Sequence, residues 1–111
     1  MQKCGIIGKL FSMLLSVPIN SLVFQILCNY GTALRKCNKL EDAVFWYSKC
    51  LALDPLDVNS HNGIGFTYHL MQNFQMAVMS YHKALSIQSN SKLTAQLLNQ
   101  VMEDSKYYAD C

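Results

Sequence analysis

Apolar residues recur at every third or fourth position over long stretches of this chain, which is the spacing of one face of an α-helix. The clearest examples run through 43–51 and 77–85, and no alternation of apolar and polar residues of similar length competes with them. The pattern therefore predicts an all-α fold. The expected helices cover residues 21 or 22 to 36, 40–53, 57 or 58 to 71, 74–88 and 92–105.

The helical pattern repeats itself further along the chain, 34 positions later. The identical pairs at this offset are Gly31 and Gly65, Ala43 and Ala77, Val44 and Val78, Tyr47 and Tyr81, Lys49 and Lys83, and Leu51 and Leu85. Two antiparallel helices cross closely only where one of them presents a small side chain, so the repeated glycines and alanines are expected at the crossing points. A period of this length built from two helices is typical of the tetratricopeptide repeat, and the chain resembles that family.

This repeat divides the chain into four segments. Residues 1–23 are a non-repeat N-terminal segment, 24–57 and 58–91 are two repeats, and 92–111 are a capping helix and tail. The expected architecture is a helix–turn–helix solenoid of two repeats plus a C-terminal capping helix, with a short N-terminal helix. The residues assigned to packing within the repeats are Gly31, Ala43, Tyr47, Pro55, Gly65, Ala77, Tyr81 and Ala84.

Apolar faces are predicted on the first and the last of these helices. In the first helix the inward-facing residues are expected to be Ile26, Leu27, Tyr30, Gly31 and Leu34. The capping helix is expected to present Leu93, Leu97, Leu98, Val101 and Met102 on one face, which covers the second repeat.

Residues 1–17 allow three interpretations. Two lysines precede an apolar run at 10–17, as in a weak signal peptide, although no clean cleavage site follows. Alternatively, residues 8–16 form a short amphipathic helix that ends before Pro18, or the segment is foreign to the family. The run is too short to cross a bilayer, which takes about 20 apolar residues, so no membrane partner is expected. A small membrane-tethered or secreted protein that uses residues 1–17 as a signal is the alternative of a different class.

Composition and charge narrow the function. Hydrophobic residues make up 51% of the chain and charged residues only 14%, so we expect another chain, or further parts of a longer protein, to cover part of its apolar surface. The net charge of +2 comes from dispersed basic residues, which argues against binding to nucleic acid. The five cysteines are odd in number and irregularly spaced, so we interpret them as reduced thiols of an intracellular protein, with Cys37 and Cys50 at packed helix positions.

Motifs for catalysis or ligand chemistry fail on inspection. Gly63-Ile64-Gly65 does not follow a predicted strand, no Cys-x-x-Cys pair occurs, and the three histidines lack the spacing of metal ligands to any cysteine. We therefore expect no enzymatic activity, no cofactor and no metal.

The first helix of each pair lines the groove of a tetratricopeptide solenoid, so its exposed inner positions are the candidate peptide contacts. These candidates are Asn29, Thr32, Arg35, Asn59, Asn62, Phe66 and His69. Asparagine side chains can bond to the backbone of an extended peptide, and Phe66 offers an apolar contact. For each residue, solvated helix surface is the alternative. Binding of a peptide's C-terminal carboxylate is not expected, because this mode of binding needs polar and cationic side chains at fixed groove positions. Those positions hold Cys28, Thr32, Gly63, Leu93 and Leu97.

A more specific resemblance runs through residues 62–87, Tyr30-Gly31, Arg35-Lys36 and 103–108. These segments are similar to the C-terminal repeat block of subunit 6 of the anaphase-promoting complex. The resemblance implies a non-catalytic scaffold in a ubiquitin ligase that acts in mitosis and cell division. It also implies other subunits of that complex as partners and the nucleus or cytoplasm as location. A generic peptide-binding adaptor unrelated to the cell cycle is the alternative among binding modules.

Overall fold

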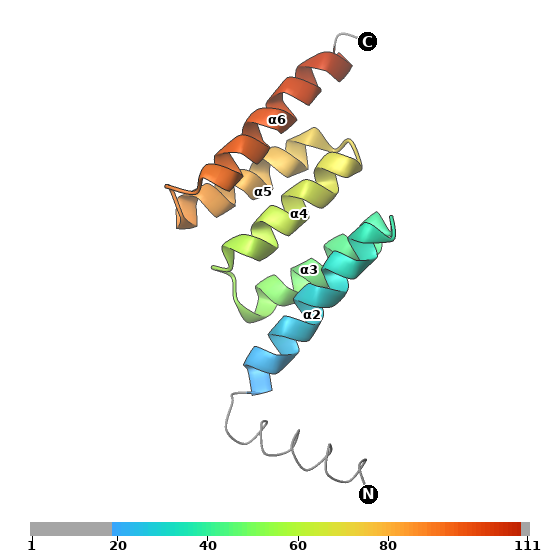
Figure 1. Cartoon of the computed structure of the whole chain (residues 1–111), viewed down its shortest axis with the longest axis vertical. Coiled ribbons are helices and arrows are strands. Elements are labelled where there is room, and N and C mark those ends of the chain that lie inside the picture. Colours follow the sequence, from blue (N-terminus) through green and yellow to red (C-terminus); the bar gives the residue numbers. More distant parts are fainter. Residues whose placement is uncertain (1–18, 110–111) are drawn as a thin grey trace, which may run out of the picture.

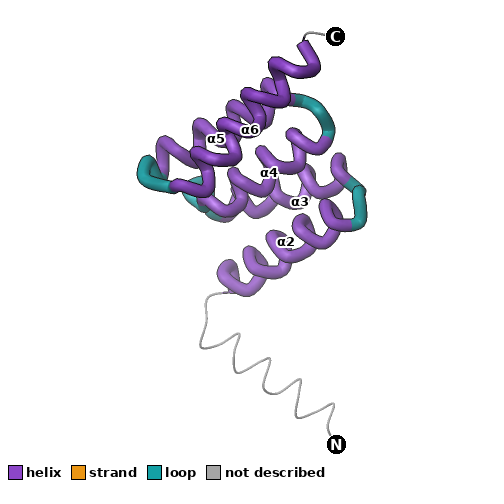
Figure 2. Tube along the Cα trace, turned by 45° about the horizontal axis from the view of Figure 1, so that its top comes forward, coloured by secondary structure: helices purple, strands orange, loops and turns teal. Residues whose placement is uncertain are grey.

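The computed structural model describes residues 19–109, which form a stack of helices (Figure 1). The helices are α2 (Ile19–Lys36), α3 (Leu40–Leu53), α4 (Val58–Leu70), α5 (Phe74–Ile87) and α6 (Lys92–Ala109). Short loops join them, and no strand occurs among the described residues (Figure 2). The prediction of an all-α helical solenoid is confirmed. The helix expected at 8–16 and the signal-like segment 1–17 lie outside the described residues.

The helices contact only near neighbours in the chain order, so the stack grows in one direction. Each helix packs against the next one, and in addition α2 contacts α4 and α4 contacts α6. The first helices of the successive pairs therefore lie on one side of the stack, with α3 and α5 on the other. Within the described chain, α2 and α6 form the two ends of the stack (Figure 1).

The turn inside each pair uses the same backbone device. Asn38 and Gln72, which occupy equivalent positions of the two repeats, both adopt left-handed conformations, with φ of 63° and 62°. In each turn the next residue bonds back to the last helical turn, since the amide of Lys39 donates to the carbonyl of Leu34 and that of Asn73 to Tyr68, both at 2.9 Å. This is the Schellman arrangement, which satisfies carbonyl groups that a helix end leaves without partners.

Side-chain caps begin three of the helices. The Asp57 carboxylate accepts a hydrogen bond from the Ser60 amide at 3.0 Å, and the side-chain Oδ1 of Asn73 accepts one from the Met76 amide at 3.3 Å. The Ser91 hydroxyl oxygen accepts one from the Thr94 amide at 3.2 Å. Such caps satisfy amide groups that the first helical turn cannot pair internally. They explain why α4, α5 and α6 begin where they do.

Two buried clusters hold the stack together, and each one spans three helices. The first consists of Leu34, Ala43, Tyr47 and Ile64, and the second consists of Ala77, Tyr81, Leu98 and Val101 with the partly buried Tyr68 against it. In each cluster a tyrosine ring lies against a glycine of the preceding helix, Tyr47 against Gly31 and Tyr81 against Gly65. A side chain at either glycine would hold the two helices further apart. The second cluster places α6 over the second repeat.

The structure differs from the sequence prediction at several surface positions. Ile26 and Tyr30 were expected to face inward, but their exposed fractions are 66% and 48%, because no described helix precedes α2 to cover that face. On α6, Leu93 and Met102 are likewise exposed, whereas Leu98 and Val101 are buried. Cys37 was expected at a packed position and is exposed in the turn after α2.

Two helices are longer than the pattern predicted. The first begins at Ile19 instead of 21 or 22, and α6 runs to Ala109 instead of 105. The additional residues at the end of α6 pack against α5, because the Tyr108 ring stacks on the Phe74 ring with the ring centroids 5.6 Å apart. None of the described helices combines the length and the apolar character needed to cross a membrane.

Candidate peptide-binding groove

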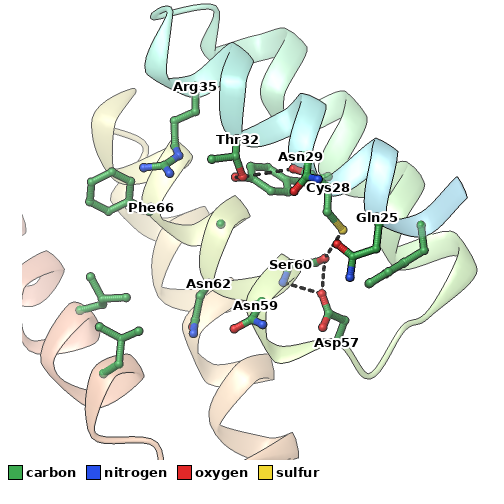
Figure 3. A pocket seen from close by; sticks show the side chains of 15 residues that line it. Gln25, Cys28, Asn29, Thr32, Arg35, Asp57, Asn59, Ser60, Asn62 and Phe66 are labelled. Atoms are coloured by element: carbon green, nitrogen blue, oxygen red, sulfur yellow. Dashed lines mark hydrogen bonds between the residues drawn. The ribbon is translucent and has the colours of Figure 1, made fainter. Parts of the chain in front are cut away.

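A cavity of about 440 Å³ opens along the side of the stack formed by the first helices (Figure 3). Helices α2 and α4 supply most of its walls and α6 closes one side. The lining residues are Phe24, Gln25, Cys28, Asn29, Thr32, Arg35, Tyr47, Asp57, Asn59, Ser60, Asn62, Gly63, Phe66, Leu93 and Leu97. We call this cavity the groove.

Six of the seven predicted contact residues line the groove. They are Asn29, Thr32, Arg35, Asn59, Asn62 and Phe66. The seventh, His69, is not among the lining residues, and its Nε2 lies 2.6 Å from Oδ2 of Asp104 on α6. That the lining residues bind a peptide stays a prediction.

The structure also places each residue that was assigned to packing. Ala43, Ala77 and Ala84 have no exposed surface, and both glycines are buried beside the tyrosine rings. Pro55 is exposed, and its carbonyl oxygen lies 2.9 Å from His61 Nε2, which ties the loop after α3 to α4.

The polar side chains of the groove fall into two groups. Thr32 and Asn62 are engaged inside the fold, since the Thr32 hydroxyl lies 2.7 Å from the Tyr47 hydroxyl and Asn62 accepts a hydrogen bond from Thr94 at 3.0 Å. The side-chain amides of Gln25, Asn29 and Asn59 are exposed and make no hydrogen bond within residues 19–109. Amides of this kind can donate to and accept from the backbone of a bound peptide.

Arg35 supplies a positive charge to the groove wall. Its guanidinium carbon lies 4.8 Å from the centre of the Phe66 ring, and its Nε is buried without a hydrogen-bond partner among the described residues. The equivalent residue of the second repeat is His69, which pairs with Asp104. Leu70 lies 34 positions before Asp104 and so occupies the position on α4 where an acidic partner of Arg35 would be expected. No acid on α4 therefore neutralises this guanidinium.

A carboxylate lies at the other end of the groove. Asp57 accepts hydrogen bonds from the amide and the hydroxyl of Ser60, at 3.0 Å and 2.5 Å. Figure 3 shows Asp57 and Arg35 at opposite ends of the labelled side chains, with Thr32, Asn29 and Ser60 between them. Phe24, Phe66, Leu93 and Leu97 add apolar surface. The groove is thus polarised along its length, with its cation near Phe66.

Neither of the two hydrogen-bonded histidines is placed for chemistry in the groove. His61 is committed to the Pro55 carbonyl and His69 to Asp104. Over residues 19–109, no three side chains of histidine, cysteine, aspartate or glutamate gather into a set that could hold a metal ion. The arrangement offers hydrogen bonds, one cation and apolar contacts, which are means of recognition.

The antiparallel helices of residues 19–109 and their lined groove define the class of this molecule, a helical-repeat scaffold for protein interactions. A family model described as TPR repeat matches residues 31–72, and one described as tetratricopeptide repeat matches residues 58–91. The chain therefore belongs to the tetratricopeptide repeat family.

Three curated relatives are similar over most of the chain. Anaphase-promoting complex subunit 6 of Dictyostelium discoideum is 35% identical over 74 residues, covering 67% of this chain and 8% of the relative. The human cell division cycle protein 16 homolog is 30% identical over 87 residues, covering 75% and 14%. Anaphase-promoting complex subunit 6 of Arabidopsis thaliana is 33% identical over 76 residues, covering 68% and 14%. The resemblance to subunit 6 is thus confirmed, while the matched part of the chain spans only 8–14% of the length of these relatives.

Proposed function

We propose that this chain is a non-catalytic scaffold that assembles with subunits of an anaphase-promoting complex and so acts in cell-cycle protein degradation. Two of its relatives are named as subunit 6 of that complex and a third as a cell division cycle protein. The proposed location, nucleus or cytoplasm, follows from the same assignment.

The groove is the proposed contact with a partner subunit, and its polarity carries this proposal. The free amides of Gln25, Asn29 and Asn59 suit the backbone of an extended peptide, and the apolar side chains suit its side chains. Arg35, which has no acidic partner among residues 19–109, suits a peptide with an acidic group near Phe66. The expected occupant is therefore an extended peptide segment that carries an acidic residue.

The test is affinity purification of the tagged chain from dividing cells, followed by mass spectrometry. Subunits of the anaphase-promoting complex are expected among the recovered proteins. Arg35→Glu should reduce their recovery by about tenfold, because each 1.4 kcal/mol of lost affinity is a factor of ten and a charged hydrogen bond contributes about that much. The matched control is Lys49→Glu, the same charge reversal on the exposed face of α3, which should leave recovery unchanged.

Two outcomes would contradict this function. Recovery of no complex subunit by well-folded wild-type chain would remove the assignment to the complex. Equal loss with Arg35→Glu and Lys49→Glu would show that binding follows net charge and not the groove.

A second candidate is a peptide-binding adaptor that acts outside the cell cycle. It is favoured by the small share of each relative that the chain covers, 8% and 14% for the first two. This candidate gains support if other proteins are recovered in a manner that depends on Arg35, while subunits of the complex are absent.

A further inference from the structure

Two cysteines lie in direct contact, one lining the groove and the other behind it. Cys28 on α2 and Cys50 on α3 are far apart in sequence, but their sulfur atoms are 2.6 Å apart. Both are free thiols. A disulfide bond is about 2.05 Å long, so a shift of about half an ångström would bring the two sulfurs to bonding distance.

The two thiols differ in their access to solvent. Cys28 is partly exposed and lines the groove, where its sulfur also lies 3.4 Å from the Ser60 hydroxyl (Figure 3). Cys50 has no exposed surface, and its thiol points to the Phe24 carbonyl at 3.7 Å. Burial, together with the Cys28 contact, raises the pKa of Cys50 to about 12, so this residue stays a thiol. A small oxidant in the groove can therefore reach Cys28 first, with Cys50 behind it.

The fold itself does not need either thiol. At the repeat offset, Cys28 corresponds to Asn62 and Cys50 to Ala84, and the second repeat packs well with those residues. The contact of Cys28 with Ser60 is likewise repeated by a hydrogen bond from Thr94 to Asn62 at 3.0 Å. Amide and methyl groups can thus fill the same positions, so packing alone does not explain a pair of cysteines there.

We propose that Cys28 and Cys50 are a reversible oxidation site, which a small hydroperoxide converts to a disulfide bond between α2 and α3. The Cys28 sulfur, as thiolate, attacks the peroxide oxygen. The O–O bond breaks, the leaving oxygen takes up a proton as water or an alcohol, and Cys28 becomes a sulfenic acid. The Cys50 sulfur then attacks the Cys28 sulfur, the S–O bond breaks, and the released hydroxide takes the Cys50 proton to form water. Two thiols lose two electrons in total, and the peroxide gains them.

The bond would change both the stability of the fold and the wall of the groove. It links α2 to α3 and so restricts the unfolded chain across the loop from 28 to 50, which stabilises the folded state. The disulfide bond would also use the Cys28 sulfur, which in the reduced protein lies beside the Ser60 hydroxyl. That hydroxyl donates a hydrogen bond to Asp57, the residue that caps α4. This inference goes beyond the proposed function, because it holds whichever peptide the groove binds.

Peptide mapping of the full chain tests the pairing directly. Trypsin, which cleaves after lysine and arginine, puts the five cysteines in separate peptides, 4–9, 10–35, 37–39, 50–83 and 107–111. Reduced chain is treated with hydrogen peroxide, denatured in N-ethylmaleimide to block the remaining thiols, and digested. Peptide 10–35 joined to 50–83 is expected as the main linked pair. The proposal is overturned if both are recovered as maleimide adducts, or if 10–35 is joined chiefly to another peptide.

Thermal melting of matched variants tests the effect on stability. Peroxide should raise the melting temperature of wild type and of Cys37→Ser, a control at an exposed cysteine, and dithiothreitol should reverse the rise. Cys50→Ala, which copies Ala84 of the second repeat, should show no rise. Cys28→Ser is the second variant, at the partly exposed position, and should also show none. A rise of equal size in either variant would overturn the proposal.

Discussion

At the scale of single residues, the contact of a tyrosine ring with a glycine sets the spacing of each helix pair. A Cβ atom at Gly65 would come within 2.6 Å of the Tyr81 ring, which has no exposed surface. At Gly31 the same atom would lie 3.2 Å from the Tyr47 ring. The two repeats share a sequence pattern, but their tolerance of a methyl group differs.

We predict that Gly65→Ala destabilises the protein by about 1–2 kcal/mol, since overpacking outweighs the gain in helix propensity. Gly31→Ala, the same change at the equivalent position, should alter the free energy of unfolding by less than about 0.5 kcal/mol, because the two effects nearly cancel. Urea unfolding followed by circular dichroism measures both. Equal losses in the two variants would contradict the distances.

The hydroxyl groups of the same two tyrosines also differ. Tyr47 reaches the Thr32 hydroxyl at 2.7 Å, but the position equivalent to Thr32 in the second repeat is Phe66. The buried Tyr81 hydroxyl therefore has no hydrogen-bond partner among the described residues. Burial also raises the pKa of Tyr81 to about 12. The Tyr81 hydroxyl thus contributes no hydrogen bond to the stability of the described fold, and phenylalanine could replace this tyrosine without loss.

We predict that Tyr81→Phe leaves the free energy of unfolding unchanged or raises it, because it removes a buried polar group without a partner. Tyr47→Phe should lower it by about 0.5–1.5 kcal/mol, the net contribution of a typical hydrogen bond. Denaturant unfolding of both variants under one set of conditions makes the comparison. A larger loss from Tyr81→Phe than from Tyr47→Phe would refute the assignment of partners.

At the scale of helices, a contact between His69 and Asp104 joins α4 to α6, in addition to the hydrogen bond from Thr94 to Asn62. His69 Nε2 lies 2.6 Å from Asp104, and the Gln100 side chain donates to the same carboxylate at 2.9 Å. The hydrogen bond with His69, followed by that with Gln100, lowers the pKa of Asp104 from its ordinary value of 3.8. This contact therefore depends on the ionised form of Asp104.

The lowered pKa sets the sign of a pH effect. The ionised Asp104 carboxylate contributes its full stabilisation of the folded state when the pH is above 3.8, the ordinary pKa. This stabilisation is lost as the pH falls through the lower pKa that Asp104 has in the folded state. We predict that Asp104→Asn is less stable than wild type at neutral pH and that the difference disappears in acid. Thermal melts across this pH range measure it. Glu103→Gln, at an exposed neighbour, is the control and should match wild type throughout. A difference between Asp104→Asn and wild type that persists in acid would contradict this origin.

Helix positions could be predicted from the sequence more fully than the contacts between helices. Helix α3 was predicted at the observed residues, because the acids in its first turn and Asp54-Pro55 after it mark both ends. The groove candidates on α2 were predicted from the repeat period together with the resemblance to tetratricopeptide solenoids, in which the first helix of each pair lines the groove. The His69–Asp104 and Cys28–Cys50 contacts could not be predicted, because they depend on how side chains from separate helices meet. The exposure of Ile26 depends on whether a further helix precedes α2, which periodicity does not encode.

At the scale of the whole molecule, the described helices differ in how many neighbours stabilise them, because α4 lies at the centre of the stack. Helix α4 contacts each of the other described helices, whereas α2 contacts only α3 and α4, and α6 contacts only α4 and α5. Large apolar side chains remain exposed at both ends, among them Ile26 on α2 and Met102 on α6. Repeat proteins of this kind lose structure from their ends, where neighbours are fewest.

We predict that native-state hydrogen exchange is slowest in α4 and fastest in the first turns of α2 and the last turns of α6. Exchange followed by mass spectrometry of peptic fragments gives the order. Slowest exchange in α2 or α6 would contradict the central position of α4.

The absence of contacts beyond next-nearest helices in the described chain also bears on how fast the protein folds. No residue of α2 has to find a partner on α5 or α6, so folding closes only short loops. Proteins dominated by such local contacts fold in microseconds to milliseconds. This stack can therefore assemble helix by helix while a ribosome is still making it, and it can refold quickly whenever a partner pulls one end open.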